Sequence, residues 1–196
     1  MNARLSRTLL AVAIAAALPL LLSACDDNDD APPTTVRDTA YGRVEGTADA
    51  ATGTYSWKGV PYAKPPVDDF VNQVYLRWRA PQPPEPWQGV RDATKPALKC
   101  TQLYTTDDWI RTGVIDPDSG EDCLYVTVFR PNSSKRLPVY VWIHGGSNNF
   151  GSAMEYGAAE LAIRSDVVVV VVQYRLGPIG WFYHPALQSG PDPLSD

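Results

Sequence analysis

The sequence has few basic residues and no cluster of them. Its 17 Lys and Arg residues are outnumbered by 22 Asp and Glu residues, which gives a net charge of −5. Proteins that bind nucleic acids depend on clustered positive charge to meet the phosphates. A nucleic-acid partner therefore has no electrostatic basis in this chain.

Histidine and cysteine are scarce as well. The chain contains two histidines, His144 and His184, and three cysteines, Cys25, Cys100 and Cys123. No pair of them has the spacing of metal ligands, so we expect no zinc or other metal site.

The remaining composition is that of an ordinary globular domain. A length of 196 residues is enough for one domain with a real core. The hydrophobic content of 44% and the charged content of 20% argue against bulk disorder. Many of the 18 prolines cluster between Pro61 and Pro96 and predict a long irregular surface segment there. No internal repeat is visible.

The N-terminus has the pattern of an export signal. Arg4 and Arg7 precede an uncharged apolar run, Leu9–Leu22, which is too short to cross a bilayer comfortably. The ending Leu22-Ser23-Ala24-Cys25 resembles the bacterial lipobox, in which the cysteine is lipid-modified and becomes the first residue of the mature protein. We therefore expect a lipoprotein signal peptide over residues 1–24 and a lipid on Cys25.

The polar segment 25–38, which begins with an Asp-rich run, would then be a tether. The protein would be exported and held by its lipid anchor to the membrane of the bacterial cell envelope, on the periplasmic side. The alternative is a plain secretory signal with Cys25 merely nearby, which would give a secreted protein.

A lipid on Cys25 leaves Cys100 and Cys123 as the only thiols. An exported compartment is oxidising, and two cysteines there most simply pair, which is worth about 3 kcal/mol in the chain-entropy model. The alternative is two free, buried cysteines.

Hydrophobic periodicity predicts a sheet that begins antiparallel. Tyr41–Gly46 and Thr54–Val60 are short alternating stretches with a Gly-containing turn between them, which indicates an antiparallel hairpin. Pro61–Pro96 is expected to be coil, which Trp78 and Trp87 pack onto the body.

The later segments predict further strands with a helix between the last two. Leu124–Phe129 has the composition of a strand, and Ala158–Arg164 that of a helix. Pro138–Ile143 and Val167–Val172 are continuous apolar runs, typical of strands that are covered on both faces, and the second is expected at the centre of the sheet. We therefore expect an α/β fold in which an antiparallel hairpin leads into a mostly parallel sheet.

The apolar run Pro138–Ile143 leads directly into His144-Gly145-Gly146. Amide N–H groups can point at a common centre only where the backbone takes unusual dihedrals, which glycine permits. Two such donors form the oxyanion hole of acyl-transfer enzymes, where each is worth roughly 3 to 4 kcal/mol. The alternative is a glycine turn that merely reverses the chain.

Five motifs occur in the order found in one enzyme family. They are G-V-P-Y-A-K-P-P (59–66), L-R-W-R-A-P with a following P-W (76–81, 86–87), E-D-C-L-Y-V (121–126), and the runs 138–146 and 170–182. With them the chain resembles the carboxylesterase type B family, the cholinesterase-like branch of the α/β-hydrolases, over roughly residues 41–182. The resemblance implies that residues 39–196 are the N-terminal portion of an α/β-hydrolase fold.

The resemblance assigns roles in the His-Gly-Gly turn. It implies that the backbone N–H groups of Gly146 and Ser147 donate to the oxyanion, that Gly145 shapes the turn, and that His144 is structural rather than the catalytic base. The chain departs from the family at Ser147 and Asn148, where a third glycine or alanine and an aromatic residue are usual. A positive φ at serine would cost more than at glycine.

The resemblance also implies two structural pairs. Cys100 and Cys123 fall where the family has its first disulfide, in agreement with the reasoning from the thiols alone. Arg77 and Glu121 fall where it has a buried ion pair, for which the alternative is two solvated surface charges.

No Gly-x-Ser-x-Gly pentapeptide occurs in the 196 residues. The resemblance places that nucleophile elbow beyond Gln188-Ser189-Gly190, and the acid and base of the triad later still. We therefore expect a fold truncated before the elbow, with no triad residue present and no ester turnover by this chain alone. The resemblance also implies that Pro138–Ile143 lies between the fourth and fifth strands of that fold, so loss of the fifth strand would leave one of its edges bare.

These observations predict the N-terminal fragment of a serine carboxylesterase. The complete enzyme would hydrolyse small-molecule carboxylic esters through an acyl-serine intermediate, without a cofactor. The alternative is a non-catalytic envelope lipoprotein that uses part of an esterase fold as a binding or scaffolding module.

Overall fold

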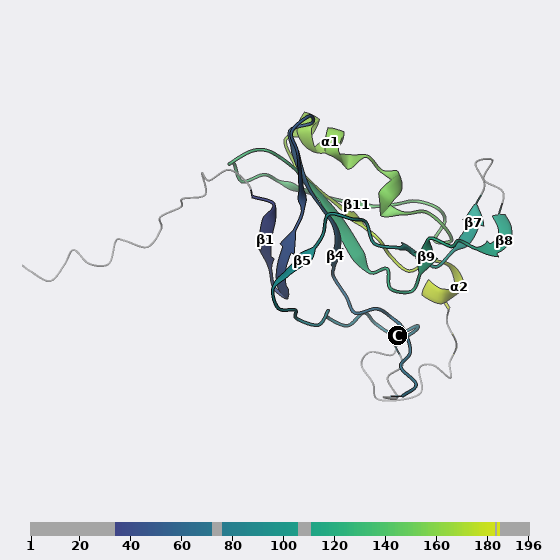
Figure 1. The fold of residues 1–196 in the computed structure, drawn as a ribbon. Helices are drawn as coiled ribbons and strands as arrows, with labels where there is room; N and C mark the ends of the chain where they lie inside the picture. Colours follow the sequence, from purple (N-terminus) through teal and green to yellow (C-terminus); the bar gives the residue numbers. More distant parts are fainter. Residues whose placement is uncertain (1–33, 72–75, 106–110, 183, 185–196) are drawn as a thin grey trace, which may run out of the picture. The chain divides into compact units, whose positions relative to one another are not determined.

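A five-stranded mixed sheet organises the chain (Figure 1). The computed structural model describes residues 34–71, 76–105, 111–182 and 184, all within the unit Pro32–Asp196. In sheet order the strands are β11 (Val139–Ile143), β12 (Val168–Val172), β10 (Tyr125–Pro131), β4 (Thr54–Pro61) and β3 (Thr47–Asp49).

The valine run forms a central strand, as its composition predicts. β12 pairs in parallel with β11 on one side and antiparallel with β10 on the other. Val169 and Val171 are completely buried, and helix α1 (Ala158–Ser165) packs against them through Ala158 and Ala162. The sheet is antiparallel from β3 to β12 and turns parallel at β11, so the parallel part within the described residues is one strand pair.

Helix α1 confirms the helix that the composition of Ala158–Arg164 predicts. It ends where Asp166 takes a left-handed conformation, with φ at 50°, and donates its N–H back into the last turn. With eight residues, α1 is short, and no helix in the described ranges is both long and apolar enough to span a membrane.

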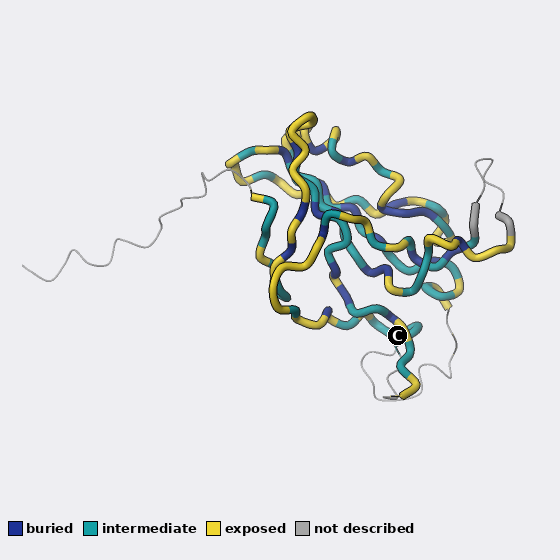
Figure 2. The backbone as a smooth tube through the Cα atoms, in the orientation of Figure 1, coloured by how far each residue is buried: buried dark blue, intermediate teal, exposed yellow. Residues whose placement is uncertain are grey.

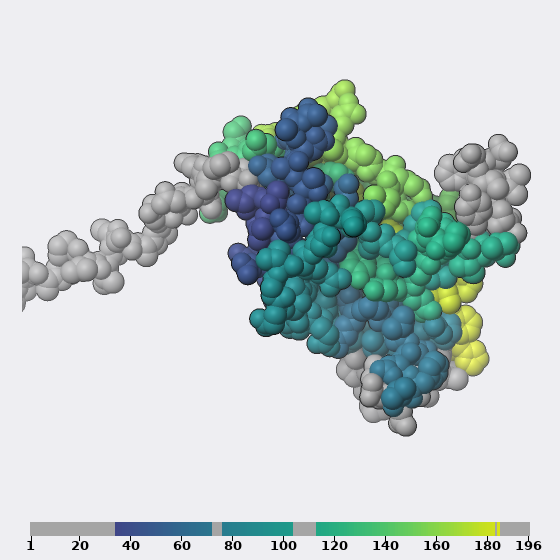
Figure 3. All heavy atoms as spheres, in the orientation of Figure 1, coloured from purple at the N-terminus to yellow at the C-terminus, as the bar shows by residue number. Residues whose placement is uncertain are grey.

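Smaller elements surround the main sheet. They are a three-stranded sheet of β1 (Val36–Thr39), β2 (Gly42–Glu45) and β5 (Val90–Asp92), the pairs β6 (Lys99–Cys100) with β9 (Ser119–Gly120) and β7 (Leu103–Thr105) with β8 (Arg111–Ile115), and the short helices η1 (Ala153–Glu155) and α2 (Gly177–Gly180). In the space-filling view, the segment that contains β5 lies beside β2, with which β5 pairs in parallel (Figure 3).

The predicted partner in the first hairpin is wrong. β4 pairs with β3, whereas β2 pairs with β1 and β5. The chain leaves β2 through Gly46, whose backbone lies so close to the Ser56 carbonyl that a Cβ there would be 2.2 Å from its oxygen. Asp49 then accepts hydrogen bonds from the N–H groups of Ala51 and Thr52, and this local turn closes the hairpin.

The three-stranded sheet begins at β1, before the expected end of the tether at residue 38. β1 starts at Val36, and the Thr35 carbonyl already accepts hydrogen bonds from the Gly46 N–H and the Trp57 indole. The polarity of the segment hides this because pairing with β2 uses backbone groups, which any side chain supplies. The predicted signal peptide, Cys25 and the predicted tether as far as residue 33 lie outside the described residues.

Strand β11 is at the edge of the sheet, with β12 as its only partner among the described strands. Val139 is 62% exposed and Ile143 is 65% exposed, so the expectation that both faces are covered is wrong for the described residues. Trp142 is the exception, because it packs on the α1 side of the sheet against Tyr156.

Two tryptophans attach the proline-rich coil, as expected. The Trp87 indole donates to the Arg43 carbonyl at 2.7 Å and packs beside the buried cluster of Val44, Trp57 and Ala93. The Trp78 indole donates to the Pro178 carbonyl at 2.7 Å. Buried residues lie along β4, β10 and β12, whereas the edge strands β3 and β11 are mostly exposed (Figure 2).

The Cys100–Cys123 disulfide joins β6 to the segment that precedes β10, across a sequence separation of 23, and both residues are 1% exposed. This confirms the predicted bond and contradicts the alternative of two free thiols.

We expect the double variant Cys100→Ala/Cys123→Ala to have a free energy of unfolding about 3 kcal/mol lower, because its unfolded chain is no longer cross-linked. Urea denaturation of the oxidised protein and of the variant measures this. Equal unfolding midpoints would contradict it.

Candidate functional site

The loop after β11 takes an unusual backbone path. Four of its residues have positive φ: Gly146 at 116°, Ser147 at 55°, Asn148 at 56° and Gly151 at 114°. Two consecutive residues with side chains in the left-handed region are costly, since only glycine adopts it freely. Ser147, at which the sequence analysis expects a positive φ to cost more than at glycine, does adopt a positive φ.

Gly146 cannot be replaced without moving the turn. A Cβ built there would lie 1.8 Å from the Phe150 carbonyl oxygen. The turn closes on itself because the N–H groups of Asn149 and Phe150 both donate to the Gly146 carbonyl, at 3.0 and 3.3 Å. The glycine is therefore a requirement of the close approach, and not only of the φ angle.

The N–H groups of Gly146 and Ser147 are not used in sheet pairing. No residue within the described ranges accepts a hydrogen bond from either of them. Ser147 is exposed and Gly146 is half-buried, so both donors lie near the surface of the turn. The turn thus offers unbonded backbone donors directly after the C-terminal end of a parallel strand.

His144 forms one wall of the turn. It is 2% exposed, its ring stacks on Tyr174 with centroids 4.4 Å apart, and its carbonyl accepts from the Tyr174 hydroxyl at 2.6 Å. Burial raises the pKa of the Tyr174 phenol, which keeps it protonated as a donor. The imidazole Nδ1 lies 2.9 Å from the Gly145 carbonyl oxygen. These contacts give His144 a structural place.

A cavity of about 430 Å³ opens beside the turn. The Gly177 N–H, at the start of α2, donates to the Asn148 carbonyl at 2.6 Å and joins the two sides of this cavity. Its lining includes Ser147, Asn148, Asn149, Gly177, Pro178 and Trp181. The arrangement can hold a small molecule against the turn.

Two serines lie near glycines in this loop, and neither has the environment of a nucleophile. Ser152 is completely buried, and its hydroxyl accepts from the Met154 N–H at 3.0 Å as the N-cap of η1. Ser147 belongs to the turn itself. The described residues also contain no group of three His, Cys, Asp or Glu side chains that could hold a metal ion.

Arg77 and Glu121 form a bidentate ion pair. The Arg77 Nε donates to Oε2 of Glu121 at 2.8 Å, and Nη2 donates to Oε1 at 2.6 Å. The hydrogen bonds that Arg77 donates to the Glu121 carboxylate raise the pKa of the guanidinium. With 30% and 21% of their side chains exposed, the pair is half-buried rather than buried, and the alternative of two separate solvated charges is wrong.

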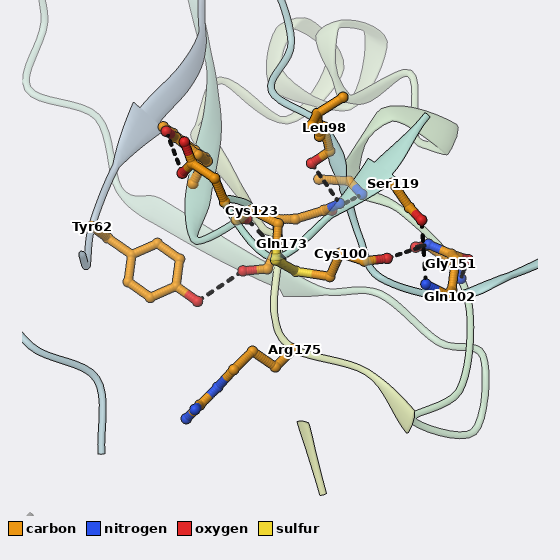
Figure 4. The surroundings of a disulfide bond; sticks show 12 residues. Tyr62, Leu98, Cys100, Gln102, Ser119, Cys123, Gly151, Gln173 and Arg175 are labelled. Carbon is orange, nitrogen blue, oxygen red and sulfur yellow. Dashed lines mark hydrogen bonds between the residues drawn. A yellow bond between two sulfur atoms is a disulfide. The ribbon is translucent and has the colours of Figure 1, made fainter. Parts of the chain in front are cut away.

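Two buried neighbours of the loop were not found by the sequence reasoning. Gln102 and Gln173 are 8% and 4% exposed, and their side chains bond to Gly151 and Ala153 at the far end of the loop (Figure 4). Neither residue has a distinctive spacing. The only signal that could have pointed to them is position, since Gln102 follows Cys100 by two residues and Gln173 directly follows β12.

Comparison with known proteins gives a consistent result. The profile described as the Carboxylesterase family matches residues 33–189. Among curated proteins, the para-nitrobenzyl esterase of Bacillus subtilis (strain 168) is 44% identical over 149 residues, which are 74% of this chain and 28% of the relative. The cocaine esterase of Homo sapiens is 40% identical over 183 residues, 87% of this chain and 31% of the relative.

Solved structures agree with these matches. A PNB esterase structure superposes with a TM-score of 0.69 at 40% identity, covering 84% of this chain and 32% of that protein. The Aspergillus niger EstA structure gives a TM-score of 0.66 at 29% identity, covering 83% of this chain and 30% of that protein. The chain thus spans about 30% of the length of the proteins that it matches.

The strained turn generates a stability prediction. Ser147→Gly should raise the free energy of unfolding by about 0.5 to 1 kcal/mol, because a left-handed conformation costs a residue with a Cβ more than the added entropy of glycine in the unfolded chain. Asn148→Gly is the matched comparison and should gain less, since asparagine tolerates this region better. Urea denaturation measures both, and a destabilised Ser147→Gly protein would contradict the explanation.

Proposed function

The chain belongs to the carboxylesterase family, and from this premise we propose that the complete protein hydrolyses small-molecule carboxylic esters through an acyl-serine intermediate. The observation that supports it most directly is the pair of backbone N–H groups at Gly146 and Ser147, which bond to no described residue and lie beside an open cavity. Preorganised donors of this kind stabilise the negative charge that develops on an ester carbonyl oxygen, by roughly 3 to 4 kcal/mol each.

The proposed reaction needs groups beyond these 196 residues. A serine hydroxyl gives its proton to a base while its oxygen bonds to the ester carbonyl carbon, and the carbonyl electron pair moves to the oxygen that the turn receives. Collapse expels the alcohol, which takes the proton from the base. Water then releases the acid by the same two steps. No cofactor takes part.

In this proposal, the residues of this chain supply the hydrogen-bond donors that stabilise the oxyanion. Gly146 and Ser147 donate the hydrogen bonds, and Gly145 lets the chain enter the turn. His144 is not the base in this proposal, because its ring is buried under Tyr174 and its Nδ1 faces the Gly145 carbonyl. The base comes from another part of the complete protein.

We also propose that the protein is exported and anchored to the bacterial cell envelope through a lipid on Cys25. The support is the sequence alone: a basic start, an apolar run without charge, and the Leu-Ser-Ala-Cys ending. An oxidising compartment agrees with the Cys100–Cys123 disulfide.

A chimera tests the proposed activity. Residues 34–182 replace the matching segment of the Bacillus subtilis para-nitrobenzyl esterase, and hydrolysis of p-nitrophenyl acetate is measured. We expect turnover, and a kcat that is about 100-fold lower in the Gly146→Ala chimera, because the added Cβ displaces the turn and its donors. Gly89→Ala is the matched control, since Gly89 also has positive φ but no atom within 4 Å of a Cβ.

Labelling with a fluorophosphonate probe separates the parts of this test. The chimera should be labelled at its nucleophilic serine, whereas the 196-residue chain, which has no Gly-x-Ser-x-Gly, should take no label. A chimera that unfolds cooperatively but neither hydrolyses the ester nor takes the probe would sink the proposal.

Cys25 gives an independent test of the anchor. Cells that express the full chain with Cys25→Ser should release the protein from the membrane fraction into the soluble envelope fraction, because the lipid acceptor is lost. Incorporation of radiolabelled palmitate measures the modification directly. Equal incorporation by the wild-type and Cys25→Ser chains would rule the assignment out.

A further inference from the structure

The Gln102 side chain forms two hydrogen bonds with the backbone of Gly151, at the end of the loop opposite the turn. The Gly151 N–H donates to Oε1 of Gln102 at 2.9 Å, and Nε2 of Gln102 donates to the Gly151 carbonyl at 2.9 Å (Figure 4). The two residues are 49 positions apart in the chain, and both bonds are buried. A carboxamide is suited to this because it offers a donor and an acceptor side by side.

Gly151 is in direct contact with the beginning of the turn. A Cβ built on Gly151 would lie 2.7 Å from Nδ1 of His144 and 2.8 Å from the Gly145 carbonyl oxygen. The backbone at Gly151 thus closes the loop against the residues that open it. Whatever fixes Gly151 also fixes the separation of the two ends of the turn.

Gln102 is itself held in place. The side-chain Nε2 also donates to the Cys100 carbonyl at 3.1 Å, and the main-chain carbonyl of Gln102 accepts from the Asp116 N–H at 2.9 Å. Cys100 is fixed in turn by the disulfide to Cys123. The carboxamide therefore has a rigid base that is independent of β11 and of the turn.

We infer that Gln102 is a positioning residue for the oxyanion turn, acting through Gly151 on the backbone donors of Gly146 and Ser147. The inference rests on the proposed function for its catalytic meaning. It gives the disulfide-bonded segment around Cys100 a role in positioning the turn. The rival role for Gln102 is purely local support of the β6–β9 pair.

Hydrogen exchange of the 196-residue chain, followed by NMR, tests the grip on the turn. In Gln102→Met, the Asn149 and Phe150 amides, which bond to the Gly146 carbonyl, should exchange about tenfold faster. Amides of β12 should be unchanged. Gln88→Met is the control, because Gln88 is an exposed glutamine of the coil. If Gln102 supported only β6 and β9, the Thr101 amide would respond and the turn would not.

A second variant keeps the test decisive if methionine disrupts folding. Gln102→Glu retains an acceptor for the Gly151 N–H but loses both donated bonds, so the same two turn amides should again exchange faster. A folded variant of either kind that leaves Asn149 and Phe150 at wild-type exchange rates would overturn the inference.

The catalytic meaning is tested in the para-nitrobenzyl esterase chimera. Gln102→Met should lower kcat about tenfold and leave KM within about twofold, because misplaced donors weaken binding of the transition state more than of the ester. A proportional rise in KM with unchanged kcat would overturn the catalytic role. A parent chimera without any turnover would refute the proposed function instead, and the exchange data would still decide whether Gln102 holds the turn.

Discussion

The close approach of Gly146 to the Phe150 carbonyl is the constraint on which the rest of the site depends. With 1.8 Å between a hypothetical Cβ and that oxygen, the turn excludes every residue except glycine. The approach bends the chain back on itself directly after β11 and removes the Gly146 and Ser147 amides from sheet pairing. Within the described residues, the tight turn and the two amides without a hydrogen-bond partner are therefore one feature.

A turn of this kind needs buried polar support, and the fold supplies it from two directions. Gln173 and Tyr174, directly after β12, bond to Ala153 and to the His144 carbonyl. Gln102, beside the disulfide, bonds to Gly151. An unpaired backbone group in the interior is expensive, so side chains that both donate and accept replace the missing strand partner. The two buried glutamines thus explain how a strained loop is held in a single arrangement.

The sequence predicted the elements whose residues decide their own environment. Six consecutive valines are too apolar for any place but a central strand, and His-Gly-Gly after an apolar run indicates a special turn. It failed where a distant segment makes the choice. The partner of β4 is set by the Asp49 turn and the contact at Gly46, β1 begins inside a polar segment, and β11 is exposed because of its place in the strand order.

By itself, the sequence determined the family resemblance, the glycines of the turn, the cysteine pair and the Arg77–Glu121 pair, since each depends on residue type and order along the chain. Only the tertiary structure decided that Ser147 and Asn148 accept left-handed dihedrals and that Gln102 reaches a residue 49 positions away. The physical reason is that hydrogen bonds between distant segments leave no periodic trace in either segment. Their partners become known only when the chain has folded.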